Sequence, residues 1–250
     1  KETFYEYNSL NHASKITEIS NGENVETLIK YPLEHADSLV TIYPNQSVSY
    51  NEYATMLKMN MLKYPIEKIR KIDGKVIEAE ANMFTLENIN GQLYPLPEFK
   101  YTLSINSPIS DYDMGSTSWD LPLAVDSRME KLKIIDRYDG QGNIVQHRQS
   151  DKHEPITLIW GYNKQYLIAK IENASVSKIA NALGISSNSV ESLNEHDLND
   201  IDNLRDILKG SLITTYRYKP LVGIISKTNS SNKKTFYQYD SQNRLEFVKD

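Results

Sequence analysis

The sequence predicts a mainly β protein: a curled antiparallel meander of consecutive hairpins that forms an open sheet or a half-barrel. Many short segments alternate apolar and polar residues, and turn residues rather than helices separate them. Tyrosine, which suits strands packed on one side, is abundant, with 17 Tyr against 5 Phe. We expect one β domain over residues 1–250 that carries a helical insertion at 174–210.

The predicted strands follow one another at short spacing. The strongest local signal is Asp73-Gly74 between two alternating runs, because both residues of a type I′ hairpin turn need a positive φ. The strand segments are 4–19 around a polar turn, 25–31, 38–43, 66–82 around Asp73-Gly74, 83–89, 99–105, 132–138, 143–149, 156–162, 166–172, 212–218, 222–228 and the closing hairpin 235–248.

One stretch near 52–62 changes to a helical period. Its apolar side chains recur on one helical face, and Pro65 is expected to end the run. These side chains are Tyr53, Met56, Leu57, Met61 and Leu62. We interpret the stretch as a short helix packed on the sheet; the alternative is a methionine-lined binding groove.

The insertion near 175–209 is helical in period as well. Its expected landmarks are a cap at Ser175 or Ser177, a stop at Gly184, a second turn from Ser187 or Asn188, and a third helix over 199–209 that ends at Gly210. Residues 176–193 also resemble a helix-turn-helix, a DNA-binding motif. Three basic and six acidic side chains lie between residues 175 and 209, so contact with phosphates is disfavoured and docking on the sheet is the preferred interpretation.

Composition excludes several classes of function. The net charge of −5 provides no overall positive field for nucleic acid or an anionic membrane. The chain has no cysteine, which excludes disulfides, thiolate zinc sites and cysteine nucleophiles. No apolar run is long enough to predict a membrane-spanning helix. Because the chain opens on Lys1-Glu2, without Met or a signal sequence, we expect a mature or shortened form.

A short unit recurs in three hairpins. Residues 237–245 align without gaps with residues 5–13, and residues 136–144 match from the second tyrosine position onward; residues 160–168 form a weaker copy. Asp or Asn suits the first position of a type I turn, and Gly or Asn suits a left-handed fourth position. The predicted turn-forming residues are Asn8, Asn11, Asp139, Gly142, Asp240 and Asn243.

These units resemble YD repeats, the Tyr-Asp-x-x-Gly-Arg-Leu units of the rearrangement-hotspot (Rhs) family. The segments YDGQGNIVQH, LIWGYNKQYLIAKIENA and TTYRYKPLVGIISKT carry the likeness, and residues 135–250 are similar to the C-terminal part of secreted YD-repeat-like proteins of Bacteroidetes. The resemblance implies a non-enzymatic, exported β-sheet scaffold or interaction module at the cell surface, in the periplasm or outside the cell. The repeats are too few to close the hollow shell that larger relatives form.

An alternative function is glycan or peptide binding on an aromatic face of the sheet. Tyrosines two apart on a strand share one face, and rings on neighbouring strands can form a ladder. The candidate binding residues are Tyr112, Trp119, Tyr216, Tyr218, Tyr237 and Tyr239. In the scaffold interpretation, the helical insertion or the protein's own side chains cover these rings.

Residues 107–127 form a predicted loop that contains the only catalytic candidates. Asp111, Asp113 and Asp120 lie near Tyr112 and Trp119, and paired carboxylates beside an aromatic ring could hydrolyse a glycoside or hold calcium. The spacing does not fit a calcium loop, because Gly115 lacks the later Glu. We interpret the segment as an acidic surface loop and expect no enzymatic activity.

The five histidines do not have the spacing of a metal site; His147 and His153 could face each other across a turn. No Gly-x-Ser-x-Gly, Gly-x-Gly-x-x-Gly or Walker motif is present. We therefore expect no metal and no cofactor, and a surface protein or glycan rather than nucleic acid as partner.

Overall fold

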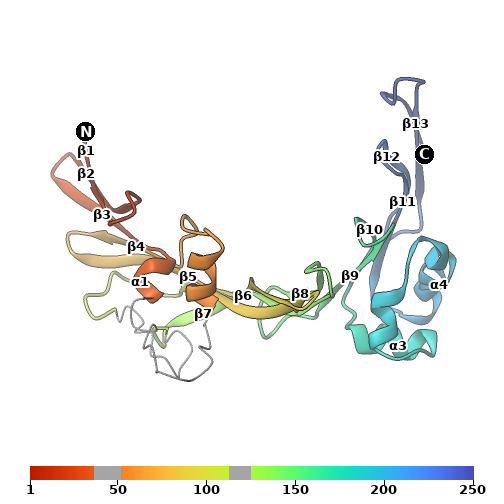
Figure 1. The fold of residues 1–250 in the computed structure, drawn as a ribbon, viewed down its shortest axis with the longest axis horizontal. Helices are drawn as coiled ribbons and strands as arrows, with labels where there is room; N and C mark the ends of the chain where they lie inside the picture. The colour runs from red at the N-terminus through yellow and green to blue at the C-terminus, as the bar shows by residue number, and fades with distance from the viewer. Residues whose placement is uncertain (37–51, 113–124) are drawn as a thin grey trace. The chain divides into compact units, whose positions relative to one another are not determined.

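The computed structural model describes residues 1–36, 52–112 and 125–250. Its 14 strands follow one another in chain order in one antiparallel sheet, which confirms the predicted mainly β, open meander (Figure 1). The strands are β1 Glu2–Tyr7, β2 Ala13–Ser20, β3 Glu23–Lys30, β4 Glu67–Ile72, β5 Lys75–Ile89, β6 Gln92–Leu103, β7 Met129–Tyr138, β8 Ile144–Arg148, β9 Ile156–Gly161, β10 Tyr166–Glu172, β11 Leu212–Lys219, β12 Gly223–Thr228, β13 Lys234–Tyr239 and β14 Leu245–Lys249.

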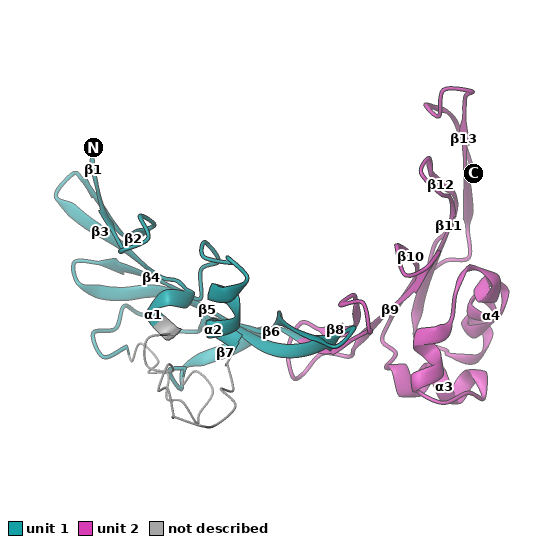
Figure 2. Cartoon of the chain, in the orientation of Figure 1, with its two compact units in different colours: residues 1–134 teal, residues 135–250 magenta. Residues whose placement is uncertain are grey.

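The chain divides into two compact units, residues 1–134 and residues 135–250 (Figure 2). The second unit covers the same residues as the stretch that most resembles YD-repeat proteins. The interpretation as one domain stays a prediction. The predicted strand at 38–43 lies outside the described residues, as do Asp113, Trp119 and Asp120.

Strands β5 and β6 differ from the prediction. The sequence predicted a break near residue 83 and a strand starting at 99, but β5 is one strand of 15 residues, and β6 begins at Gln92. Asn90 and Gly91 join them with φ values of 53° and 86°. Pro95 and Pro97 made the start of β6 resemble a loop, because proline cannot donate to a ladder. The pairing shifts just beside Pro97, where a bulge tolerates it.

The repeat turns share one hydrogen-bond pattern. At Asp240, the carboxylate accepts the backbone N–H groups of Gln242 and Arg244 at 2.8 and 2.9 Å. The Asp240 carbonyl accepts from Asn243, whose φ is 59°. Asn8 and Asp139 make the same bonds in their turns, with Asn11 and Gly142 in the left-handed position.

A further turn of this kind, which the sequence analysis missed, joins β12 to β13. Asn229 accepts the backbone N–H groups of Ser231 and Lys233, and Asn232 has a φ of 59°. Its signal was the Asn-x-x-Asn spacing, but no tyrosine precedes it.

The weaker copy at 160–168 forms a different turn. Tyr162, Asn163 and Lys164 all have positive φ, between 51° and 65°. Glu195 explains part of this difference, because its carboxylate accepts the Tyr162 backbone N–H and lies against Gly161. A Cβ at Gly161 would lie 3.0 Å from the Glu195 carboxylate, so only glycine leaves room for this contact.

The core of the first unit forms where α2 (Glu52–Lys58) packs on the sheet. Tyr53 and Met56 are buried, as the sequence predicted. The helix ends well before Pro65, because Asn60 adopts a left-handed conformation and the Met61 N–H bonds the Met56 carbonyl, a Schellman-type end. A shorter helix, α1 (Pro32–Ala36), precedes it.

The insertion packs on one face of the second unit's sheet. Its elements are α3 (Val176–Leu183), the 3₁₀ turns η1 (Asn188–Ser192) and η2 (Glu195–Asp197), and α4 (Leu198–Ile207). Ser175 caps α3 by accepting from the Lys178 N–H, and Gly184 ends it with a φ of 69°. The second element is a 3₁₀ turn, so the segment lacks the second α-helix that a helix-turn-helix requires.

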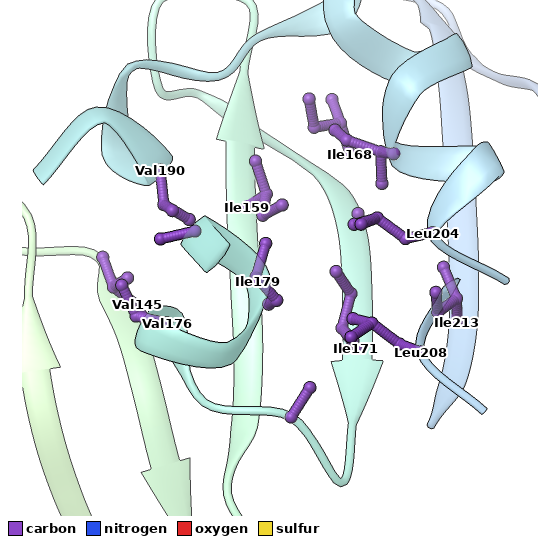
Figure 3. Close-up of a cluster of buried hydrophobic side chains, with 14 of the residues drawn as sticks. Val145, Ile159, Ile168, Ile171, Val176, Ile179, Val190, Leu204, Leu208 and Ile213 are labelled. Carbon is purple, nitrogen blue, oxygen red and sulfur yellow. The ribbon is translucent and has the colours of Figure 1, made fainter. Parts of the chain in front are cut away.

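Apolar side chains hold the insertion against the strands. Ile179 and Leu204 of the helices face Ile159, Ile171 and Ile213 of the sheet, and all five are 2% exposed or less (Figure 3). None of the described helices is long and apolar enough to span a membrane.

We predict that Leu204→Ala lowers the free energy of unfolding of the second unit by about 2–5 kcal/mol, because it leaves a cavity in this core. The matched control is Ile207→Ala on the same helix, whose side chain is 55% exposed; its effect should stay within about 0.5 kcal/mol. Urea unfolding measures both, and equal losses would contradict the packing described.

The closing hairpin should lose stability in acid. The backbone N–H of Arg244, and then its side chain, lower the pKa of Asp240, so its contribution is present above the unfolded value of about 3.9 and is lost as the pH falls through the lower folded value. Amide NMR shifts of Gln242 and Arg244 should report the loss. The Asn8 turn serves as internal control, because the Asn8 side-chain amide does not titrate. Asp240→Asn should remove the pH dependence of the Gln242 and Arg244 amide shifts. Parallel behaviour of the two turns in the wild-type protein would refute the prediction.

Candidate functional site

Four tyrosines project from one face of the second unit's sheet: Tyr216 and Tyr218 of β11, and Tyr237 and Tyr239 of β13. We call them the tyrosine face. Arg217, Ser226 and Phe236 are paired in turn across β11, β12 and β13 and therefore share the opposite face. Tyr216 and Tyr218 flank Arg217, Tyr237 follows Phe236, and Tyr239 lies two residues further. Because side chains alternate along a strand, all four tyrosines lie on the face opposite Arg217 and Phe236.

The helical insertion lies on the other side of the sheet. The Thr215 hydroxyl donates to Asp202 of α4 at 2.8 Å, and the Arg217 guanidinium donates to Asn199 of the same helix at 2.9 Å. Ile213, on the same face as these two residues, is 1% exposed. The insertion therefore does not cover the tyrosine face, and the rings there are half-buried by other means.

Ring packing provides part of that burial. The Tyr218 ring lies 5.8 Å from Tyr162, 4.9 Å from Tyr166 and 6.5 Å from Tyr216, measured between centroids. Such offset and edge contacts are the favoured geometries of aromatic pairs. The Lys227 ammonium lies 5.9 Å from the Tyr216 ring centroid, which places a cation beside the ring cluster.

Tyr162 and Tyr166 belong to this cluster, although the sequence analysis did not name them as site residues. They come from the β9–β10 hairpin, whose turn has an unusual left-handed run. The sequence signal was the departure of residues 160–168 from the repeat.

Tyrosine hydroxyls bond the backbone where strand pairing is irregular. The pairing of β11 with β12 shifts between Arg217 and Tyr218. At that position, the Tyr162 hydroxyl accepts the Tyr218 N–H at 2.9 Å and donates to the Tyr218 carbonyl at 3.1 Å. The Tyr239 hydroxyl donates to the Ile224 carbonyl on the partner strand at 3.0 Å. At these positions the ladder with the neighbouring strand has already ended, since β10 pairs with β11 only as far as Thr215 and β13 pairs with β12 only as far as Ser226. The hydroxyls supply partners for backbone groups beyond those ends.

The same arrangement occurs in the first unit. The pairing of β1 with β2 shifts between Glu6 and Tyr7, and the Tyr31 hydroxyl donates to the Ala13 carbonyl beside that shift at 3.1 Å. His12, which occupies the arginine position of the repeat, packs its ring on Tyr31 at 5.2 Å.

Burial, followed by the neighbouring Tyr216, raises the pKa of Tyr218 above the ordinary value of 10.0. Tyr218 is therefore a neutral phenol at physiological pH. Its ring cluster can stack on an apolar surface, and phenols of this kind can share hydrogen bonds with hydroxyl or amide groups of a ligand.

A groove of 360 Å³ lies at the C-terminal end of the sheet. Phe236 and Phe247 line it and are each 51% exposed. Its full lining is Lys219, Ile225, Phe236, Tyr237, Gln238, Tyr239, Phe247 and Lys249. Phe236 is paired with Lys249 and Gln238 with Phe247, so most of this lining lies on the face opposite the tyrosine face, and the groove is separate from the tyrosine cluster.

Of the other two predicted binding residues, Trp119 lies outside the described residues and Tyr112 lies in the first unit. The Tyr112 hydroxyl lies 3.3 Å from Glu67 and from the Met129 sulfur. It packs against that unit's core and is not part of the tyrosine face. A binding role for Tyr112 stays a prediction.

The described catalytic and metal candidates have structural partners. Arg128 donates to Asp111 at 2.8 Å, and this bond and charge lower the pKa of Asp111. Arg128 also bonds the buried Asp126, so it joins two parts of the loop. His153 Nδ1 lies 2.6 Å from the Ser150 hydroxyl in its own turn. Within residues 1–36, 52–112 and 125–250, no group of three His, Asp or Glu could hold a metal.

We predict that Tyr162→Phe lowers the free energy of unfolding of the second unit by about 1 kcal/mol, because the N–H and carbonyl of Tyr218 lose their hydroxyl partner. The control is Tyr216→Phe, which removes a hydroxyl from the same ring cluster but no hydrogen bond among the described residues. Thermal unfolding compares them. If both variants were as stable as the wild-type protein, the hydrogen bonds between the Tyr162 hydroxyl and the Tyr218 backbone would add no stability, which would contradict the prediction.

No protein-family model matches the chain, and no curated protein is similar to it. Among solved structures, it is similar to the crystal structure of TcdB2-TccC3-TEV, with 10% identity over 98% of this chain and a TM-score of 0.44. It is also similar to the crystal structure of TcdB2-TccC3, with 9% identity over 98% of this chain and a TM-score of 0.36. The chain spans only 14% and 12% of those two chains, and the likeness concerns the fold alone.

Proposed function

We propose that the protein is a non-enzymatic β-sheet scaffold or interaction module of the YD-repeat type. The observation that carries this proposal is that the polar side chains of the repeat form hydrogen bonds with the protein's own backbone. Asn8, Asp139 and Asp240 each accept two backbone N–H groups, so their side chains hold turns. The Tyr162 and Tyr239 hydroxyls bond the backbone beside a bulge. The residue types that recur along the chain thus build the sheet.

An exported location, at the cell surface, in the periplasm or outside the cell, is part of the proposal. Its support is the resemblance of residues 135–250 to secreted YD-repeat-like proteins. A surface protein or a glycan is the partner class that fits such a location.

A second candidate function is binding of a glycan or an extended peptide on the tyrosine face. The observation that favours it is the position of the helical insertion on the opposite side, which leaves Tyr216, Tyr218, Tyr237 and Tyr239 half-buried rather than covered. Aromatic rings stack on the apolar faces of sugars, and the Lys227 ammonium beside Tyr216 adds a polar contact.

A thermal-shift screen against glycans and extended peptides separates the two functions. The scaffold proposal predicts that no ligand raises the Tm through the tyrosine face. A true ligand at about 100 times its Kd would add about 2.7 kcal/mol of stability, which the screen detects readily.

Matched variants locate any ligand that does raise the Tm. Tyr216→Ala and Tyr237→Ala should abolish a shift that arises on the tyrosine face. Tyr7→Ala, on a strand of the first unit with 58% of the side chain exposed, should leave it unchanged. A shift lost in the first two variants and kept in the third would replace the pure scaffold with a binding module.

A further inference from the structure

Two tight hairpin turns of the first unit have the same residues and the same backbone. Asn21-Gly22 joins β2 to β3, and Asn90-Gly91 joins β5 to β6. The two asparagines have φ values of 54° and 53°, and the two glycines have values of 85° and 86°. All four residues are exposed. They are the two Asn-Gly pairs of the sequence, so the chain contains the same chemical group twice in matched surroundings.

An Asn-Gly pair can modify itself without an enzyme. The backbone nitrogen of the glycine loses its proton and attacks the side-chain carbonyl carbon of the asparagine. A C–N bond forms, the bond from that carbon to the side-chain nitrogen breaks, and the proton leaves with the nitrogen as ammonia, so a closed succinimide ring remains. Water then opens either carbonyl of the ring and gives aspartate or isoaspartate. Glycine favours the attack because it has no Cβ to obstruct the close approach.

The glycine nitrogens of the two turns differ in one contact. The Gly91 N–H donates to the side-chain carbonyl oxygen of Asn88 at 2.9 Å. The Gly22 N–H donates to no group within the described part of the chain. A donated proton is held on its nitrogen, because its removal also breaks the hydrogen bond. The nucleophile is therefore restrained at Gly91 and unrestrained at Gly22.

We propose that Asn21 is a site of spontaneous deamidation in the folded protein, and that Asn88 protects Asn90 from the same reaction. Water is the only other reactant, and no cofactor takes part. The proposal does not depend on the scaffold or binding functions above, because it concerns the chemistry of the turn itself.

The reaction alters a turn that contacts a second turn. The Asn24 N–H donates to the Asp73 carboxylate at 3.4 Å, and the Asp73 N–H donates to the Asn24 carbonyl at 3.0 Å. Deamidation adds a negative charge two residues before Glu23, and isoaspartate adds a methylene group to the backbone of a tight turn. In deamidated protein separated by anion exchange, the Asn24 and Asp73 amides should therefore exchange hydrogen faster than in fresh protein. Unchanged exchange would contradict this consequence.

Peptide mapping by mass spectrometry tests the proposal on purified protein kept at mildly alkaline pH, which favours loss of the amide proton. Conversion at Asn21 should be about fivefold faster than at Asn90, the ratio that corresponds to about 1 kcal/mol for one hydrogen bond. Equal rates at the two sites overturn the proposal. So does an Asn21 that stays unmodified for as long as the unfolded chain needs to react.

The same chain unfolded in urea is the control for sequence context. Both pairs should then react at the same rate, because each is an asparagine followed by glycine and neither turn persists. A fivefold difference that remained in urea would come from the flanking sequence rather than from the structure, which also overturns the proposal.

Asn88→Ala tests the protection directly. It removes the acceptor of the Gly91 N–H at an exposed position, so the fold should persist, which circular dichroism checks. Conversion at Asn90 should rise about fivefold, while conversion at Asn21 stays unchanged. The matched control is Leu93→Ala, which shortens the exposed side chain paired with Asn88 and should change neither rate. An unchanged rate at Asn90 in Asn88→Ala, or an equal rise in Leu93→Ala, overturns the role of Asn88.

Discussion

The rest of the structure depends on one local interaction, the capture of two backbone N–H groups by the Asp or Asn that opens a repeat turn. At Asp139, Asp240, Asn8 and Asn229, it reverses the chain within four residues and leaves the fourth residue left-handed. Each such turn returns the chain beside the strand it has just left, which places β2, β8, β13 and β14 next to the strands that precede them. The long connections between β3 and β4, β6 and β7, and β10 and β11 also leave each strand beside the one before it.

The second recurring element is the tyrosine hydroxyl beside a bulge. Beside each of these bulges the ladder with the next strand has already ended, so backbone groups on that side lack ladder partners. Tyr162, Tyr239 and Tyr31 supply those partners from a neighbouring hairpin. This gives a reason for tyrosine at these three positions: phenylalanine could fill the same space but could not bond the backbone. Gly223 shows how close the approach is, since a Cβ there would meet the Tyr239 hydroxyl at 2.4 Å.

The candidate site was only partly predictable. Alternation placed Tyr216 and Tyr218 together, and Tyr237 and Tyr239 together, because period-two spacing sets the face within a strand. That both pairs share one face depends on the register of β11, β12 and β13, and a bulge changes register by one residue. Tyr162 and Tyr166 could not be found this way, since they reach the cluster from a turn whose geometry depends on Glu195, 33 residues away from Tyr162.

By itself, the sequence determined the elements that local forces control: the alternating strands, the Asp73-Gly74 hairpin, the repeat turns and the caps of α3 at Ser175 and Gly184. These depend on residues a few positions apart. Only the tertiary structure decided which sheet face the insertion covers and the merging of residues 75–89 into one strand. Those outcomes depend on contacts between segments far apart in the chain, such as Thr215 with Asp202 across the sheet and helix, and such contacts leave no periodic signal in the sequence.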